Sequence, residues 1–437
     1  FGAGVDEPYA IVQMNRNNEV DPNVRATEQE LFEGLEAKSV NCWPNVNFDI
    51  GAINNFLNKF FPAGFYYKTF MWPKSFWYKI YEPIIRKAAG FGAASIKHDK
   101  ERYEHKYEYC DLLIAGTGPS GLASAYAAAK NGAKVILAED KSRYGGSLLT
   151  SEVTIGNQSG KDWADQIISE LKSMPNVIVK NRSQVFGYYD HNMLVMSERV
   201  SDHLPKTDKY TPKQRLWYIR ANEVIISSGS IERPLVFGNN DTPGVMLSSA
   251  AKEYLKVYGV LVGKKPIIFT NNDSGYETAI EFKKNGVDPI VLDTRKDANS
   301  EIIKEAKELN IIIKFSYVVV AAKGYKKVNS ADIAKISDDK KAISNIENIK
   351  CDCICVSGFW TPTIHLASQS GNKTKFNEEI DAFIPSHSKQ KETTLGSANG
   401  VFTLEETLKT SFEKGSELSK QITNKENKVT IPIVLEK

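Results

Sequence analysis

The sequence lacks the features that mark several large classes of protein. Within its 437 residues no uninterrupted apolar run approaches the roughly 20 residues needed to span a bilayer. An excess of positive charge is also missing: 56 lysines and arginines nearly balance 53 aspartates and glutamates, so nothing points to a surface for nucleic acid or anionic lipid. We expect no signal peptide and a soluble, cytoplasmic protein, whose length and 41% hydrophobic content predict two or three globular domains.

Cysteine is scarce, and the five cysteines lack the spacing of a metal or redox site. Cys351, Cys353 and Cys355 alternate along the chain, so we expect them on one face of a strand. Zinc and thiol-redox motifs usually place two residues between cysteines. Cys42 and Cys110 are isolated, which leaves no quartet for an iron–sulfur cluster. We therefore expect packed, reduced thiols and no metal site.

The most informative segment is a glycine motif, Gly116-Thr-Gly-Pro-Ser-Gly121, which follows an apolar run and precedes an alanine-rich helix. Gly116 permits a tight turn, Gly118 lets the backbone approach a pyrophosphate, and Gly121 lets the helix pack against the strand. Glu139 closes the next apolar strand about twenty residues on, where a carboxylate accepts hydrogen bonds from an adenosine ribose and repels a 2′-phosphate. The pattern predicts a dinucleotide-binding βαβ unit that prefers NAD or FAD to NADP.

Other turns are expected to complete this nucleotide site. A glycine turn at 144–147 follows the second strand, and a small-residue turn at 228–230 ends a buried strand. Val185 lies where a backbone amide is expected to meet an adenine, and segment 396–400 precedes a helix whose N-terminus would face the nucleotide. The predicted cofactor-binding residues are Gly116, Gly118, Pro119, Ser120, Gly121, Glu139, Asp140, Lys141, Gly146, Ser147, Val185, Ser228, Gly229, Asn399 and Gly400.

A second strand-turn-helix pattern, over residues 265–293, mirrors the spacing of the first. Its three glycine positions hold Asn271, Asp273 and Tyr276. We expect Tyr276 to crowd the packing of the helix on the strand, and Asp273 to place negative charge where a pyrophosphate would lie. The unit should keep a Rossmann shape without binding a dinucleotide in the usual way.

The order of elements predicts an α/β protein with two dinucleotide-binding-type domains and an irregular, aromatic-rich N-terminal extension, the plan of disulfide reductases. We assign residues 1–105 to the extension and 106–245 to the first part of the dinucleotide-binding domain. Residues 246–355 form the inserted, degenerate domain, and 356–437 return to the first domain and end in a tail. The aromatic run at 60–81 either clamps onto its own domain or contacts another subunit or a flavin.

With these segments assembled, the chain resembles the α subunits of heterotetrameric sarcosine oxidases. The matching segments are Asn41-Cys-Trp-Pro44, Phe48-Asp-Ile-Gly51, Pro62 to Phe70, Ile231 to Phe237, Asn240 to Met246, Asn271-Asn-Asp-Ser274 and Gly396-Ser-Ala-Asn-Gly400. Those α subunits are longer, with a ferredoxin-type N-terminal part that lacks cluster cysteines and a C-terminal half like folate-binding aminomethyltransferases. The resemblance implies that residues 1–18 are the tail of the former, so we expect a central module that is excised, incompletely sequenced or natively short.

The resemblance also implies the cofactors and partners. NAD would be held by the first unit, without an established redox role, and FMN would lie between the α and β subunits. The β subunit would carry FAD and the sarcosine site, a δ subunit would hold zinc, and a γ subunit would complete the tetramer. The reaction of the family oxidises sarcosine to glycine with oxygen as acceptor, forming peroxide and passing the one-carbon unit to tetrahydrofolate as methylenetetrahydrofolate.

We expect no catalytic residue in this chain, and no activity from it alone. It contains no Cys-x-x-Cys motif and no histidine paired with an acid beside the glycine loop, and His365 is interpreted as structural. Phe65, Tyr66 and Tyr67 are predicted to lie at the α/β interface or near FMN. Two alternatives stay open: the α subunit of a related opine, proline or cyanide-forming amine dehydrogenase complex, or a stand-alone FAD-dependent pyridine nucleotide oxidoreductase.

Overall fold

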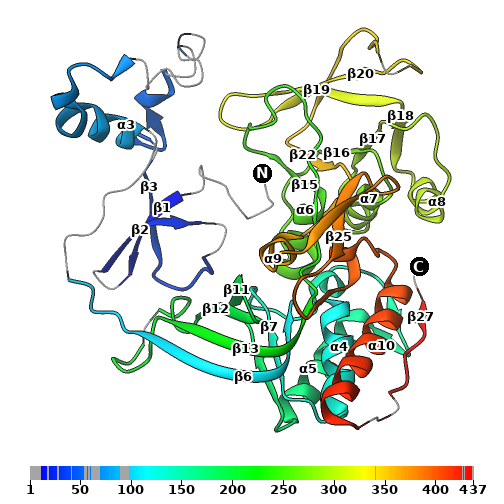
Figure 1. Ribbon diagram of the computed structural model, residues 1–437. Coiled ribbons are helices and arrows are strands. Elements are labelled where there is room, and N and C mark those ends of the chain that lie inside the picture. Colours follow the sequence, from blue (N-terminus) through cyan, green and yellow to red (C-terminus); the bar gives the residue numbers. More distant parts are fainter. Residues whose placement is uncertain are drawn as a thin grey trace. The chain divides into compact units, whose positions relative to one another are not determined.

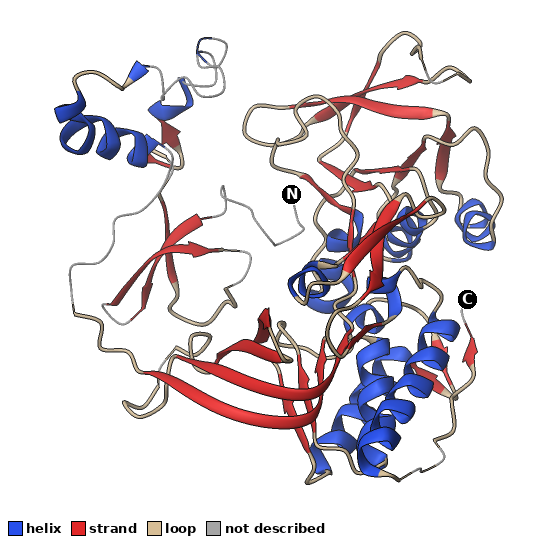
Figure 2. Cartoon of the chain, viewed as in Figure 1, coloured by secondary structure: helices blue, strands red, loops and turns tan. Residues whose placement is uncertain are grey.

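The structure is a computed structural model (Figures 1 and 2). It describes residues 11–16, 19–26, 29–40, 42–53, 57, 60, 69–88, 98–205, 207–339, 341–425, 427 and 429–435. The described residues form two compact units. The larger unit holds those of 105–198 and 215–437, and the smaller holds those of 4–104 and 199–214. The four-part division expected from the sequence stays a prediction.

The smaller unit contains an antiparallel sheet with the strand order β2-β1-β3. Lys213 ties the 199–214 segment to this sheet, because its ammonium lies 2.7 Å from Asp21 on β2. Prolines divide the aromatic run, so that helix η4 begins directly after Pro73 and a π-helix, η5, follows it. The elements are β1 (Ile11–Arg16), β2 (Glu19–Arg25), β3 (Glu36–Ser39), β4 (Pro44–Asn45), β5 (Phe48–Asp49), η2 (Ile50–Ile53), η4 (Lys74–Phe76), η5 (Trp77–Tyr81) and α3 (Glu82–Ala88).

The larger unit is built around two large sheets, beside several smaller ones, and the first large sheet has the order β10-β7-β6-β13-β12-β11, with β26 beside β13. β6, β7 and β10 run parallel, and Leu112–Ala115 of β6 pair in register with Val135–Ala138 of β7. Its strands are β6 (Tyr103–Ala115), β7 (Val135–Ala138), β10 (Val177–Lys180), β11 (Ser183–Tyr189), β12 (Met193–Arg199), β13 (Gln214–Ile226) and β26 (Glu392–Thr394). The central parallel strands are apolar on both faces, because one face packs against helices and the other mainly against side chains of β11, β12 and β13.

Three helices, α4 (Pro119–Lys130), α5 (Gly160–Ser173) and α10 (Leu404–Thr423), pack together against the first sheet (Figure 1). The alanine-rich sequence of α4 lets α10 approach closely. Gly415 lies against the backbone of Ser124, where an added Cβ would be 2.4 Å from the Ser124 carbonyl oxygen. The Ser120 and Ser411 hydroxyls hydrogen bond at 2.8 Å. Small residues and buried hydroxyl groups therefore determine how α10 packs on α4.

The second sheet is fully parallel, with the order β15-β22-β16-β17-β18. Helices cover one face and a three-stranded antiparallel sheet, β19-β20-β21, covers the other, which gives two apolar layers. We call this part of the larger unit the second domain, and the first large sheet with its helices the first domain. The elements are β15 (Val245–Leu247), α6 (Ser248–Tyr258), β16 (Pro266–Thr270), α7 (Ser274–Lys284), β17 (Ile290–Asp293), α8 (Glu301–Glu308), β18 (Ile312–Phe315), β19 (Tyr317–Lys323), β20 (Ser330–Lys335), β21 (Glu347–Lys350) and β22 (Cys353–Ser357).

The cysteine triplet corrects one expectation. Cys353 and Cys355 do share a face of β22 and pack against the helices, with 3.6 Å between their sulfur atoms. Cys351 packs in the opposite layer instead. The reason is that β22 begins only at Cys353, so the alternation does not extend back to Cys351. All three thiols are buried and reduced, and burial raises the pKa of Cys351 to about 12.

Short strands and turns connect the two sheets. β14 pairs antiparallel with β23, and the β24–β25 hairpin follows α9. The bounds are η6 (Gly146–Leu149), β8 (Thr154–Ile155), β9 (Gln158–Ser159), β14 (Ser230–Glu232), β23 (Trp360–Pro362), α9 (His365–Gln369), β24 (Lys373–Asn377), β25 (Ala382–His387), η7 (Gly396–Asn399) and β27 (Val434–Leu435). The predicted α/β architecture with two Rossmann-type sheets is confirmed. No helix among the described residues is long and apolar enough to cross a membrane.

Candidate functional site

The first glycine turn folds as its sequence predicts, because steric contacts leave room only for glycine. Gly116 has φ +108°, and its N–H donates to the Ala138 carbonyl at 2.8 Å. A Cβ atom added at Gly116 would lie 2.3 Å from the carbonyl oxygen of Ser227. A Cβ at Gly121 would lie 1.9 Å from the carbonyl oxygen of Gly116. The turn therefore places the start of α4 directly at the end of β6.

The same turn leaves open space at Gly118. No described atom beyond the chain neighbours lies within 4 Å of a Cβ added there. Gly118 is the N-cap of α4 and has no side chain to cap the helix, while Pro119 at the first helical position has no N–H to satisfy. Free N–H groups and the positive end of the helix dipole make such a turn a phosphate site. The geometry of the loop fits the pyrophosphate of a dinucleotide.

The second glycine turn packs against the first, and its part in binding a nucleotide stays a prediction. The N–H of Gly145 donates to the carbonyl of Thr117 at 3.0 Å. Gly146 has φ +55°, and a Cβ there would approach the Cα of Gly118 to 2.8 Å. Ser147 follows within η6 and is exposed. This turn forms a wall of the space at Gly118.

Glu139 is held at the end of β7 by hydrogen bonds that the sequence did not reveal. Its Oε2 accepts from the Thr117 N–H at 3.0 Å and from the Thr117 hydroxyl, and its Oε1 accepts from the Lys141 N–H at 3.1 Å. Burial, together with the neighbouring Asp140, raises the pKa of Glu139 to about 7. A carboxylate has about four acceptor positions, so a ribose hydroxyl still finds one. Thr117, which lies between the first two glycines, is a site residue that the motif alone did not identify.

The predicted adenine position lies on β11, the strand that begins beside the backbone of Glu139. Ser183 opens β11, and its N–H donates to the Glu139 carbonyl at 2.7 Å, which puts Val185 two residues further along that strand. The Val185 side chain packs on the core of the first sheet, so only its backbone remains available to a ligand. The role of Val185 in binding stays a prediction.

The remaining predicted residues lie in two turns near α4. The Ser228 hydroxyl donates to the Thr363 carbonyl at 2.8 Å, and a Cβ at Gly229 would lie 4.0 Å from the Ser397 hydroxyl. A Cβ at Gly396 would meet the Cβ of Ser120 at 3.0 Å, so the start of η7 touches the start of α4. Sequence reasoning named the other end of this segment, Asn399 and Gly400, instead. A Cβ at Gly400 would meet the β24–β25 hairpin, 3.3 Å from Ile384.

Two further expectations concern His365 and the aromatic residues Phe65, Tyr66 and Tyr67. His365, which we interpreted as structural, is the first residue of α9 and is exposed. Phe65, Tyr66 and Tyr67 lie outside the described residues, and their role stays a prediction. Among the residues that are described, no group of three or more His, Cys, Asp or Glu side chains is arranged to hold a metal ion.

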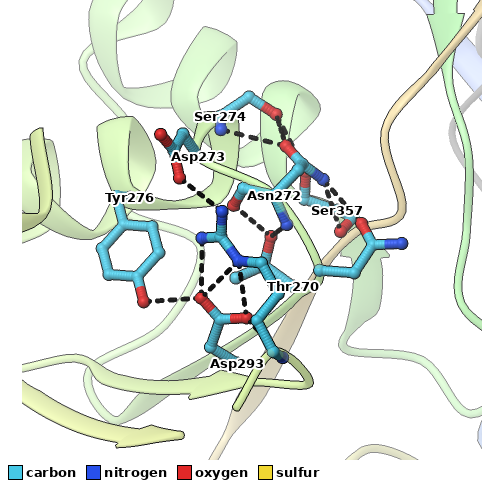
Figure 3. Close-up of polar contacts among 9 residues, drawn as sticks. Thr270, Asn272, Asp273, Ser274, Tyr276, Asp293 and Ser357 are labelled. Carbon is cyan, nitrogen blue, oxygen red and sulfur yellow. Dashed lines mark hydrogen bonds and ion pairs between the residues drawn. The ribbon is translucent and has the colours of Figure 1, made fainter. Parts of the chain in front are cut away.

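The second strand-turn-helix unit is filled by its own side chains (Figure 3). Arg295 places its guanidinium 2.8 Å from Asp273 and 2.8 Å from Asp293. The Tyr276 hydroxyl donates to the same Asp293 carboxylate at 2.8 Å, and Asp293 is fully buried. The carboxylates outweigh the effect of burial and raise the pKa of Arg295 above its usual value. An arginine thus occupies the turn that a pyrophosphate would need.

Tyr276 does not crowd the helix, which corrects our expectation. Gly275 makes the close approach instead, since a Cβ there would lie 2.7 Å from the side chain of Thr270. With Gly275 at the contact, Tyr276 turns its ring into the core beside α7, where it is fully buried. Asn272 completes the turn by accepting from the Ser274 N–H at 3.0 Å and donating to the Ser357 carbonyl at 3.1 Å.

Comparison with known proteins gives consistent results. The family model described as pyridine nucleotide-disulphide oxidoreductase matches residues 110–384. The chain is 43% identical over 398 residues to the alpha subunit of sarcosine oxidase from Rhizobium meliloti (strain 1021), covering 91% of this chain and 39% of that protein. It is 23% identical to a subunit of opine oxidase from Agrobacterium tumefaciens (strain Ach5), covering 64% of this chain and 58% of that protein. The resemblance to sarcosine oxidase α subunits is confirmed.

Solved structures share the fold at low sequence identity. The L-proline dehydrogenase from P. horikoshii matches with a TM-score of 0.52 and 18% identity, over 76% of this chain and 58% of that chain. This likeness concerns the fold alone. The chain spans 39% of the length of the sarcosine oxidase subunit that it matches.

Proposed function

Because the chain belongs to the pyridine nucleotide-disulphide oxidoreductase family, we propose that it is the NAD-binding α-subunit module of a heterotetrameric sarcosine oxidase. One observation carries the nucleotide assignment: the turn at Gly118 is open above an uncapped helix, while its twin is closed by Arg295. A single NAD in the first unit is therefore the arrangement that we favour.

In this proposal the residues of the chain bind and orient the nucleotide. The start of α4, with Gly118, Pro119 and Ser120, receives the pyrophosphate, and Glu139 accepts a ribose hydroxyl. NAD, when bound, is a hydride acceptor in chemical terms. The described residues around the loop are glycines, serines and hydrogen-bonded carboxylates, which position a ligand and, within this part of the structure, form no proton-transfer pair. We assign no catalytic residue to it.

The amine oxidation itself is assigned to a β subunit, which would hold FAD and oxidise sarcosine to glycine with formation of peroxide. FMN would lie at the interface of the α and β subunits, while zinc, tetrahydrofolate and the γ and δ subunits belong to the rest of a cytoplasmic complex that forms methylenetetrahydrofolate. Support for a multi-subunit setting comes from the relatives, which carry subunit designations. The isolated chain should then be inactive.

The α subunit of an opine-oxidising complex, or of another amine dehydrogenase complex, is the second candidate. The similarity to a subunit of opine oxidase supports it. A stand-alone FAD-dependent reductase is the third, because the first unit of a two-dinucleotide fold commonly takes FAD. The three candidates differ in the cofactor that the first unit holds and in the partner that selects the amine.

Two experiments separate them. Cofactors released from the purified chain by denaturation should contain colourless NAD, identified by mass spectrometry and by its absorbance. A yellow protein with a flavin spectrum would remove the NAD assignment in favour of a flavin reductase. Co-expression with a β subunit, followed by assays with sarcosine, proline and opines, should give activity with sarcosine, and only when the complex has formed. Activity of the chain alone would contradict the proposed function.

A further inference from the structure

Helix α6 of the second domain contacts the positively charged residues beside the nucleotide site. The ammonium of Lys141 lies 3.4 Å from each carboxylate oxygen of Glu253. Two residues further along the first domain, the guanidinium of Arg143 lies 5.6 Å from the ring centre of Tyr258. Glu253 and Tyr258 both belong to α6, so one helix engages both side chains.

The backbone of Lys141 is hydrogen-bonded to the carboxylate that would hold the ribose. Its N–H donates to Oε1 of Glu139 at 3.1 Å, which places the base of the lysine side chain beside the 2′-hydroxyl position of a nucleotide bound there. Lysine carries its ammonium on a flexible four-carbon stem and is a common phosphate ligand. A free Lys141 would thus be well placed to bind a 2′-phosphate.

We propose that Glu253 is a specificity-determining residue, which favours NAD over NADP by holding Lys141 away from the position of a 2′-phosphate. This inference rests on the proposed function, since it assumes that the first unit binds a dinucleotide. Glu139 disfavours a 2′-phosphate by its own charge, and Glu253 adds a second effect by removing the nearest ammonium.

The charges around this position set the size of the effect. Glu139, Asp140 and Glu253 are acidic, while Lys141 and Arg143 are basic; Arg182, whose N–H donates to the Lys141 carbonyl at 2.9 Å, adds another cation. The Lys141 and Glu253 side chains are 60% and 36% exposed. Exposed ion pairs contribute little free energy, so releasing Lys141 should change NADP affinity several-fold and not by orders of magnitude.

The test uses the full 437-residue chain, freed of nucleotide, and isothermal titration calorimetry with NAD⁺ and NADP⁺. Glu253→Gln keeps the size of the side chain and removes its charge. We expect it to tighten NADP⁺ binding about fivefold while NAD⁺ affinity changes by less than about twofold, and the gain should shrink at high salt. The double variant Glu253→Gln/Lys141→Met should lose the gain. Glu277→Gln, which removes the partner of Lys252 on α6, is the matched control and should leave the affinity ratio unchanged.

The outcomes separate this inference from the proposed function. An unchanged NAD⁺/NADP⁺ ratio in Glu253→Gln, with NAD⁺ bound normally by the unsubstituted chain, overturns the role of Glu253 and leaves the NAD assignment standing. A gain that persists in the double variant overturns the role of Lys141. If the unsubstituted chain binds neither NAD⁺ nor NADP⁺, or holds a flavin in this site, the proposed function and this inference are both wrong. Thermal unfolding of each variant checks that the fold is retained.

Discussion

The two strand-turn-helix units of this chain, with their turns at residues 116–121 and 271–276, have the same plan and differ in what fills the turn. In the first, the space at Gly118 is open and the helix behind it begins without a capping side chain. In the second, Arg295 lies between Asp273 and Asp293 and takes up the turn. The backbone plan is therefore not enough to define a nucleotide site, because the turn must also be left free of side chains.

The acid at the end of the second strand shows the same contrast. Glu139 accepts hydrogen bonds from its neighbours Thr117 and Lys141 and keeps an acceptor position for a ligand. Asp293 receives the Tyr276 hydroxyl and the Arg295 guanidinium, and it is fully buried. In the second unit, therefore, side chains of the protein itself provide the positive charge and the hydrogen bonds that Asp293 would otherwise obtain from a ligand.

The largest expected effect concerns the close approach of helix and strand in the two units. Gly121→Ala should destabilise the chain by about 3 kcal/mol or more, because the new Cβ would lie 1.9 Å from a backbone oxygen. Gly275→Ala should cost less, about 2 kcal/mol, because its Cβ would lie 2.7 Å from the Cβ and hydroxyl of Thr270, a milder overlap than the 1.9 Å contact at Gly121. Urea unfolding of both variants measures the difference. Equal losses would show that the two contacts are equally rigid and would break the comparison at this point.

The second prediction tests the open turn. Gly118→Val should weaken NAD⁺ binding at least about 100-fold, or about 2.7 kcal/mol, because the side chain would fill the place of the pyrophosphate. The fold should survive, since Gly118 has φ −65° and open space around it. Calorimetric titration gives the affinity, and the melting temperature is the control. NAD bound at full stoichiometry by this variant would refute the assignment of the loop.

The third prediction tests the closed turn. Arg295→Ala leaves the buried Asp293 without its charged partner and should destabilise the second domain by about 2 kcal/mol. NAD⁺ affinity should stay the same, because Arg295 is not part of the first unit. The variant Arg295→Lys, which keeps the charge but not the planar fork, should recover part of the stability. A new nucleotide-binding event in Arg295→Ala would instead mean that the arginine alone had blocked a working second site.

Local steric constraints explain why the first unit could be predicted from the sequence. Gly116 and Gly121 meet backbone oxygens at distances that exclude any side chain, so the glycine spacing itself encodes the turn. The missing glycines at Asn271 and Tyr276 predict a unit that does not bind a dinucleotide in the usual way, and that stays a prediction. The Arg295 contact could not be read in the same way, since it forms only when β17 aligns beside β16.

Errors arose where the position of an element boundary decides the result. Cys351 lies outside β22. Because Cys351 and Asp352 do not continue the strand, Cys351 packs in the opposite layer. The helix contact of the second unit was expected at Tyr276 and lies one residue earlier, at Gly275. Glu253 could not be predicted from the sequence either, because its partner Lys141 is brought to it only by the packing of two domains. Contacts between distant segments depend on tertiary packing, which periodicity does not report.

The smallest expected effect is a pH dependence that distinguishes the acid of the first unit. Burial and Asp140 raise the pKa of Glu139 to about 7 in the folded chain, against an ordinary value of 4.5. Between these values the folded chain binds more protons than the unfolded chain, so this contribution to stability is present below pH 4.5 and is lost as the pH rises through about 7. NAD⁺ affinity should change in the opposite sense, because only the ionised carboxylate accepts a charge-assisted bond from the ribose.

We therefore expect NAD⁺ binding to tighten about threefold from pH 6 to pH 8 while the stability of the nucleotide-free chain declines, as charge-assisted hydrogen bonds exceed neutral ones only modestly. Titration in two buffers of different ionisation enthalpy should reveal proton release on binding near pH 6. Glu139→Gln should flatten both profiles, whereas the matched Glu277→Gln variant should keep them. Opposite trends of stability and affinity that vanish together in Glu139→Gln identify this carboxylate as the ribose acceptor, and profiles that persist there assign the titration to another group.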